Sequence, residues 1–145
     1  MGVKFILAFF AVLAIDQGVK QLFLGGFRYD GEFISLVLVF NDGVAFSMLS
    51  SLGEWLKYIQ LSLVGAIICY LFYERKLLRE YAIAIGVLLG SGASNILDRF
   101  IHGGVVDYVF WHKWFNFAVF NLADVLIDLS VAYILISSLK RRKNG

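Results

Sequence analysis

The chain has 145 residues, of which 60% are hydrophobic and 17% are charged, and it contains no proline. Its mean hydropathy of +0.78 is too high for a water-soluble domain of this size, so the composition indicates an integral membrane protein. The net charge of +2 without a basic tract interleaved with aromatic residues excludes a nucleic-acid partner, and the single Cys69 excludes a disulfide framework or a cysteine-based metal site.

Four segments are apolar and long enough to cross a bilayer, which takes about 20 helical residues. They are residues 3–24, 55–73, 81–97 and 117–139. A short charged loop, residues 74–80, joins the second and third segments, so we expect these two to form an antiparallel hairpin. The expected fold is a single all-α membrane domain over residues 1–145, with four transmembrane helices.

The first segment has a competing interpretation, because Lys4 and the eleven apolar residues after it resemble a secretory signal peptide. However, no small-residue cleavage site precedes the polar stretch DQGVKQ. Removing the segment would also leave an odd number of helices between two sides that both look cytoplasmic. We therefore treat it as the first span.

Basic residues define the expected orientation. Eight of the thirteen lie at one set of span ends: Lys4, Arg75, Lys76, Arg79, Lys140, Arg141, Arg142 and Lys143. By the positive-inside rule this side is cytoplasmic, so both termini face the cytoplasm and the longer connections, residues 25–54 and 98–116, face outward.

The outer connections carry two further patterns. In the first, the β-branched apolar run FISLVLVF, flanked by turn residues, predicts a small β-rich extracytoplasmic segment at the membrane surface. The second outer connection and the residue just after it carry aromatic side chains, which indicate an aromatic belt at the membrane interface. These are Trp111, Trp114, Phe115 and Phe117.

Polar residues from four distant pieces of the chain fall at one level, towards the outer face. They are Asp16, Gln17, Lys20, Asn41, Asn95, Asp98, Arg99, Asp107, Asn121 and Asp124. A charge within the bilayer costs a few kcal/mol even on the most permissive insertion scale, so intramembrane acids indicate a functional site.

Several of these residues also have structural interpretations. Asp16 and Lys20 have the i, i+4 spacing of a stabilising pair. Asp98 beside Arg99 at a helix end is explained by an interfacial ion pair or by a helix terminus contact, although the Arg99 guanidinium could instead bind a substrate carbonyl or a lipid phosphate. The small residues GSGAS at 90–94 indicate close helix packing.

Asp107 and Asp124 flank the expected return of the chain into the membrane, so a hairpin-like turn could bring their carboxylates together. Two adjacent carboxylates share a proton and together can activate water and protonate a leaving amine. This aspartic protease chemistry needs no metal and no cofactor. His102 and His112 raise a metal site as the alternative, but they lack zinc-protease spacing.

Asp128 lies one turn deeper than Asp124. We expect it to be protonated and hydrogen-bonded within the helix bundle, or to support the Asp107 and Asp124 pair from one turn deeper in the membrane.

Five blocks of the chain resemble those of the bacterial lipoprotein signal peptidase family, also called signal peptidase II, in the same order. They are DQ with Lys20, NDGVAF at 41–46, GSGASNILDR at 90–99, GVVD ending at Asp107, and FNLAD ending at Asp124. The resemblance implies an aspartic endopeptidase whose catalytic pair is Asp107 and Asp124. It further implies that other polar residues bind substrate or support the pair: Asp16, Asn41, Asn95, Arg99 and Asn121.

The resemblance also implies the reaction, which is hydrolysis of a prolipoprotein before its diacylglyceryl-modified cysteine. The expected location is the bacterial cytoplasmic membrane, with the site towards the outer leaflet, surrounded by membrane lipid and active as a monomer. The segment 25–54 would cover the site. Val19, Ser91, Ser94 and Asp128 depart from the usual family pattern.

A small proton-coupled transporter is the main alternative function, since intramembrane aspartates also form proton relays. It predicts inverted repeats or broken helices near the midplane, and the sequence contains neither. A purely structural membrane protein would have no need of these acids.

Overall fold

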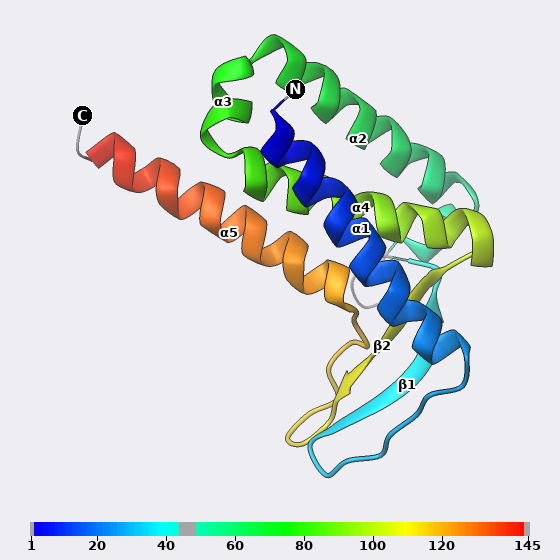
Figure 1. The fold of residues 1–145 in the computed structure, drawn as a ribbon. Helices are drawn as coiled ribbons and strands as arrows, with labels where there is room; N and C mark the ends of the chain where they lie inside the picture. The colour runs from blue at the N-terminus through cyan, green and yellow to red at the C-terminus, as the bar shows by residue number, and fades with distance from the viewer. Residues whose placement is uncertain (1, 44–48, 144–145) are drawn as a thin grey trace.

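The computed structural model describes residues 2–43 and 49–143, so residues 44–46 of the NDGVAF block lie outside the described part. Long helices lie side by side, and a two-stranded sheet projects beyond one end of them (Figure 1). The elements are α1 (Val3–Leu24), β1 (Ile34–Asn41), the 3-10 helix η2 (Ser50–Leu52), α2 (Trp55–Tyr73), α3 (Arg75–Glu80), α4 (Ala82–His102), β2 (Val105–Trp111) and α5 (Leu122–Lys143).

The predicted bounds of the first two spans are confirmed as helices by α1 and α2. The α4 helix continues to His102 instead of ending near residue 97, and it stops at Gly103, whose φ of 77° suits glycine. The α5 helix begins at Leu122, because Phe120 before it forms a bridge with Val109 of β2. By length and composition, α2 and α5 are able to cross a membrane.

Small residues let α4 pack closely on α1, as the sequence predicted. A Cβ atom on Gly90 would stand 2.5 Å from the carbonyl oxygen of Phe9, and one on Gly86 would stand 2.6 Å from that of Phe5. Side-chain atoms at either position would push the two helices apart. The close approach places the polar face of α1 directly against the polar end of α4.

The predicted strand is confirmed as β1, and its partner is the other outer connection. The two strands are antiparallel, with Val39 opposite Asp107 and Asn41 opposite Val105, and a register shift interrupts the pairing between Leu36 and Val39. The sheet thereby carries Asn41 and Asp107 to the same end of the helices.

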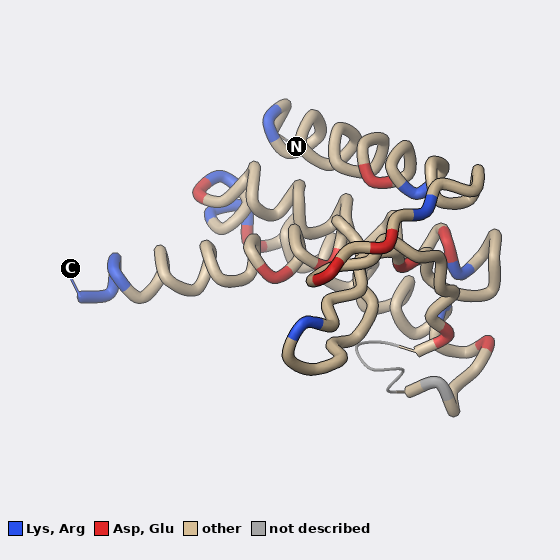
Figure 2. Tube along the Cα trace, turned by 90° about the horizontal axis from the view of Figure 1, so that it is seen from below, with Lys and Arg blue, Asp and Glu red and all other residues tan. Residues whose placement is uncertain are grey.

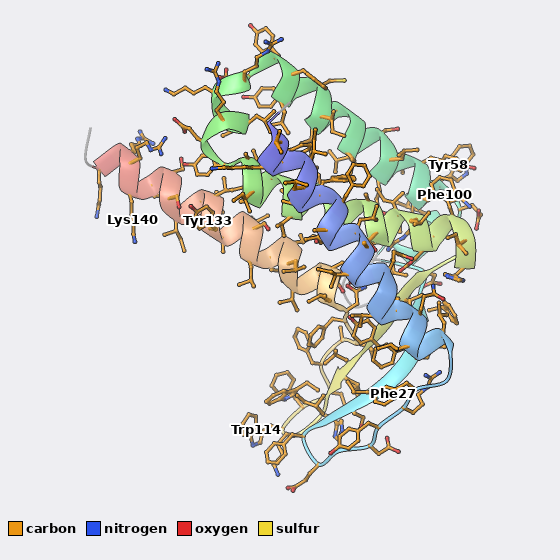
Figure 3. The ribbon with its side chains drawn as sticks, in the orientation of Figure 1. Phe27, Tyr58, Phe100, Trp114, Tyr133 and Lys140 are labelled. Carbon is orange, nitrogen blue, oxygen red and sulfur yellow. The ribbon has the colours of Figure 1, made fainter. Side chains whose placement is uncertain are left out.

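The two ends of the molecule differ in character. Lys and Arg residues gather where α3 and both chain termini lie (Figure 2). Trp114 and Phe27 lie on the projecting outer segments, far from Lys140 on α5 (Figure 3), and Trp114 is 74% exposed. The basic end and the exposed aromatic end of the molecule therefore lie apart. Which of them faces the cytoplasm stays a prediction.

Candidate active site

Asn121 and Asp124 cap the first turn of α5. The Asn121 side-chain oxygen accepts a hydrogen bond from the Asp124 backbone N–H at 2.9 Å, and Asp124 Oδ2 accepts one from the Asn121 N–H at 3.1 Å. This is the reciprocal geometry of a capping box, made here by asparagine and aspartate. The Asp124 carboxylate is therefore held by the start of its own helix.

The next two N–H groups of α5 are bound by side chains from other elements. Leu122 N–H donates to the Tyr108 hydroxyl of β2, and Ala123 N–H donates to Asp16 Oδ1 of α1, both at 2.9 Å. The first N–H groups of a helix have no partner within the helix. Here they attach the start of α5 to β2 and α1.

Asn121 also joins the two aspartates that the sequence singled out. Its side-chain nitrogen donates to Asp107 Oδ1 at 2.7 Å, while Asn41 Nδ2 donates to Asp107 Oδ2 at 3.0 Å. Asn95 Nδ2 donates to Asp124 Oδ1 at 2.9 Å. Each of the four carboxylate oxygens thus accepts a hydrogen bond, and these donors all belong to predicted site residues.

Asp107 is buried, with an exposed fraction of 2%. Burial raises its pKa from the ordinary 3.8 to about 7, and the negative charge of Asp124 acts in the same direction. The hydrogen bonds from Asn41 and Asn121 oppose this shift because they favour the ionised form. The Asp107 carboxyl can therefore hold or release a proton near neutral pH.

A buried cation, Lys20 of α1, pairs with two further aspartates, Asp16 and Asp98. Lys20 Nζ is 2.7 Å from Asp16 Oδ2 and 2.7 Å from Asp98 Oδ2, and it donates to Asn95 Oδ1 at 2.8 Å. Lys20 and Asp16 are fully buried. The predicted Asp16 to Lys20 pair is confirmed, and through Asn95 it is connected to Asp124.

Asp98 pairs with Lys20 rather than with Arg99, its predicted partner. Adjacent residues on a helix point in different directions, so Asp98 faces α1. Asp98 Oδ2 also accepts the Val106 N–H at 3.1 Å, which holds the start of β2 beside α4.

Ser94 and Tyr108 support the site, although neither was among the predicted site residues. Ser94 Oγ donates to Asp16 Oδ2 at 2.6 Å, and Tyr108 holds the start of α5. Their positions in the sequence could have indicated this role, because Ser94 lies one helical turn before Asp98 and Tyr108 directly follows Asp107.

Arg99 connects the site to the outer segment. Its guanidinium donates to the carbonyl oxygens of Gly43 and Asn95. Within the described part of the chain, the buried Nε atom of Arg99 has no hydrogen-bond partner. This N–H is therefore a candidate donor to a bound molecule.

A cavity of about 620 Å³ adjoins Asp107 and Asp124. Its other polar lining includes Asn41, Arg99 and Gln60 of α2, and the rest is largely apolar. The Gln60 side-chain oxygen is buried without a partner among the described residues, and Gln60 was not among the predicted site residues.

Asp128 also lines this cavity, but its side chain is exposed, so the predicted position inside the bundle is wrong. The reason is that Asp128 lies on the side of α5 that lines the cavity.

A family model described as signal peptidase (SPase) II matches residues 8–140. The chain belongs to this family. It is 58% identical over 137 residues to a lipoprotein signal peptidase of Campylobacter jejuni, covering 94% of this chain and 88% of that one. It is 53% identical to the lipoprotein signal peptidase of Wolinella succinogenes, covering 93% of this chain and 92% of the relative.

A solved bacterial membrane enzyme has a similar structure, with a TM-score of 0.81 and 25% identity over 97% of this chain and 90% of that one. These likenesses give no support to the transporter alternative.

Proposed function

We propose that this signal peptidase II family member is an aspartic endopeptidase that removes signal peptides from prolipoproteins, cleaving before the diacylglyceryl-modified cysteine. The substrate follows from the relatives, which are lipoprotein signal peptidases. The observation that carries the mechanism is that Asn121 donates hydrogen bonds to both Asp107 and Asp124 beside one cavity.

In the proposed reaction one carboxyl of the pair is protonated and the other is ionised. The carboxylate takes a proton from a water molecule as the water oxygen attacks the scissile carbonyl carbon. At the same time the protonated carboxyl donates its proton to the carbonyl oxygen. The tetrahedral diol then collapses: the carboxyl that took the water proton gives it to the leaving amine as the C–N bond breaks, and the ionised carboxylate takes a proton from a diol hydroxyl, which restores the starting state. The pair titrates as a unit, so its shared proton belongs to both groups.

The surrounding amides are proposed to balance this pair. Burial and the mutual repulsion of the carboxylates favour protonation, whereas the donors Asn41, Asn95 and Asn121 favour ionisation. Opposed effects of this kind keep one proton on two carboxyls near neutral pH.

Two polar atoms in the cavity are proposed to bind the substrate. Among the described residues, Arg99 Nε–H and Gln60 Oε1 have no partner, so the first can donate to a peptide carbonyl and the second can accept a peptide N–H. Leu63, Val64 and Val125 provide apolar walls suited to a signal peptide.

The proposed setting is a bilayer crossed by α1, α2, α4 and α5, with both termini cytoplasmic and the site towards the outer leaflet. The polar site at the sheet-bearing end supports this depth, since hydrolysis needs water that the bilayer centre lacks.

The test is a gel-shift cleavage assay with purified diacylglyceryl prolipoprotein in detergent and EDTA. Asp107→Asn and Asp124→Asn are expected to fall below about a thousandth of wild-type turnover while remaining folded. Cleavage by both folded variants would overturn the catalytic pair, and loss of wild-type activity on adding EDTA would overturn the metal-independent mechanism.

A further inference from the structure

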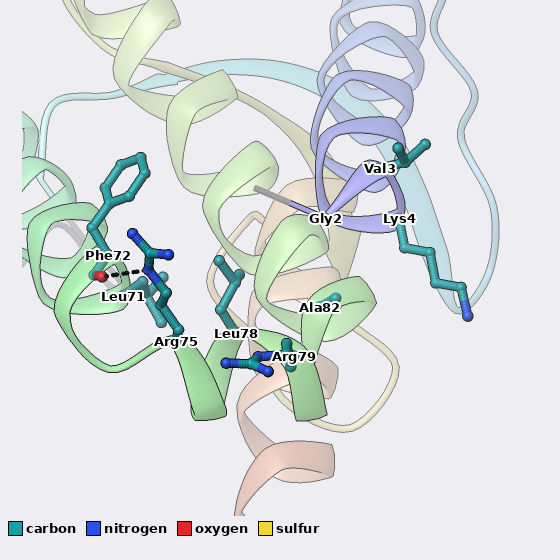
Figure 4. A pocket seen from close by; sticks show the side chains of 9 residues that line it. All are labelled: Gly2, Val3, Lys4, Leu71, Phe72, Arg75, Leu78, Arg79 and Ala82. Carbon is teal, nitrogen blue, oxygen red and sulfur yellow. Dashed lines mark hydrogen bonds between the residues drawn. The ribbon is translucent and has the colours of Figure 1, made fainter.

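A second cavity, of about 770 Å³, lies at the end of the molecule away from the sheet (Figure 4). It is formed by the start of α1, the end of α2, α3 and the start of α4. None of its lining residues lines the candidate active site.

Positive charge dominates this cavity. Lys4, Arg75 and Arg79 are in its lining, and none of the described lining residues is acidic. Glu80, which follows Arg79, pairs with Arg141 of α5, and Glu74 does not line the cavity. The guanidinium of Arg75 makes a long hydrogen bond of 3.4 Å to the Phe72 carbonyl, which leaves other donors available.

The start of α1 adds to this charge. Within the described part of the chain, no side chain caps the helix, and its first turn holds no acidic residue. The unpaired N–H groups at a helix start carry partial positive charge. Gly2, Val3 and Lys4 bring this end of α1 to the cavity wall.

The rest of the lining is apolar. Leu71 and Leu78 are buried, whereas Phe72 is 52% exposed and Val3 is 70% exposed. Figure 4 shows Leu78 between the guanidinium groups of Arg75 and Arg79, with the Phe72 ring beyond Arg75 and the Lys4 side chain extending outward from α1. A ligand that matches this lining combines an anionic head with a hydrocarbon tail.

We propose that this cavity binds an anionic phospholipid. The phosphodiester is held by Arg75 and Arg79, whose planar forks suit paired phosphate oxygens. The acyl chains lie along Phe72 and Val3, and the bound lipid connects α1 to the α2–α3–α4 corner. Basic pockets at the cytoplasmic ends of membrane helices are suited to such headgroups. This site is independent of the proposed catalytic pair.

The experiment measures lipid binding to the full chain by native mass spectrometry in detergent, with phosphatidylglycerol and phosphatidylcholine as probes. The variant Arg75→Gln/Arg79→Gln removes two cavity charges. The control Lys140→Gln/Lys143→Gln removes two charges from α5 that do not line the cavity. Phosphatidylglycerol binding is expected to weaken about tenfold or more in the cavity variant, and less than about twofold in the control.

Equal weakening in both variants would overturn the site in favour of diffuse surface charge. Equal binding of the two lipids to wild type would overturn the headgroup preference. Displacement by millimolar inorganic phosphate would show a small-anion site instead of a lipid site. If the double Gln variant is not folded, Arg75→Lys/Arg79→Lys replaces it, and undiminished binding there would overturn the paired guanidinium contacts.

Discussion

Asn121 and Asp124 hydrogen-bond each other twice across the first turn of α5, side chain to backbone in both directions. The same Asn121 side chain donates to Asp107. One residue therefore starts the helix and orients both aspartates, so its structural and functional contributions can be separated by substitution.

Asn121→Ser is expected to keep the helix cap but lose the reach to Asp107. Serine is as good a cap as asparagine, so the free energy of unfolding should fall only through the lost hydrogen bonds of the Asn121 amide, by about 1–3 kcal/mol. Turnover should fall about a hundredfold. Asn121→Ala should lose the cap as well, costing about 1 kcal/mol more. Denaturation in detergent and the cleavage assay measure the two effects, and full activity of Asn121→Ser would contradict the orienting role.

Lys20→Met is expected to destabilise the protein by about 3–5 kcal/mol, because it leaves Asp16 and Asp98 as buried carboxylates without a cation. Adding Asp98→Asn should restore part of this loss. The matched control is Lys57→Met, which removes a pair with the exposed Glu54 and should leave the melting temperature unchanged. An unchanged melting temperature for Lys20→Met would show that the buried network does not stabilise the fold.

Activity is expected to decline as the pH rises above about 7, because the raised pKa of Asp107 marks where the pair loses its shared proton. A profile of kcat/KM from pH 5 to 9 checks this, and a flat profile above neutrality would contradict it.

The same pKa shift predicts a pH-dependent stability. The folded pKa of Asp107 lies above the ordinary value of 3.8, so the folded state binds the proton more tightly. The resulting stabilisation is full below about pH 4 and is lost as the pH rises towards 7. Melting temperatures over this range should show that slope in wild type and a weaker slope in Asp107→Asn. Identical slopes would assign the effect to other groups.

Asp128→Asn is expected to retain turnover within about threefold of wild type. The Asp128 side chain is exposed at the cavity, and the substitution keeps its shape. The cleavage assay compares it with Asp124→Asn, one turn away. A loss as large as that of Asp124→Asn would place Asp128 in the proton pathway.

Gly90→Ala is expected to destabilise the helices by about 1–3 kcal/mol, since its Cβ would collide with the Phe9 carbonyl. The control is Gly65→Ala on α2, where a Cβ meets nothing within 4 Å. Alanine favours helix there, so stability should hold or rise by about 0.5–1 kcal/mol. Similar melting temperatures for both variants would contradict the close contact of α1 and α4.

Sequence alone determined the features that depend on local composition and periodicity. Apolar runs defined α1 and α2 to the residue, and a β-branched run defined β1. Lone polar residues in apolar segments indicated the candidate site, because placing a charged side chain in the bilayer costs free energy and such residues are usually functional.

Only the tertiary structure decided which distant groups meet. In the structure β1 pairs with β2, and Asp98 forms an ion pair with Lys20. The α5 helix begins only at Leu122, because Phe120 before it bonds to the sheet. Such contacts depend on how the helices and strands pack and in which register they pair, and a local sequence pattern leaves both open.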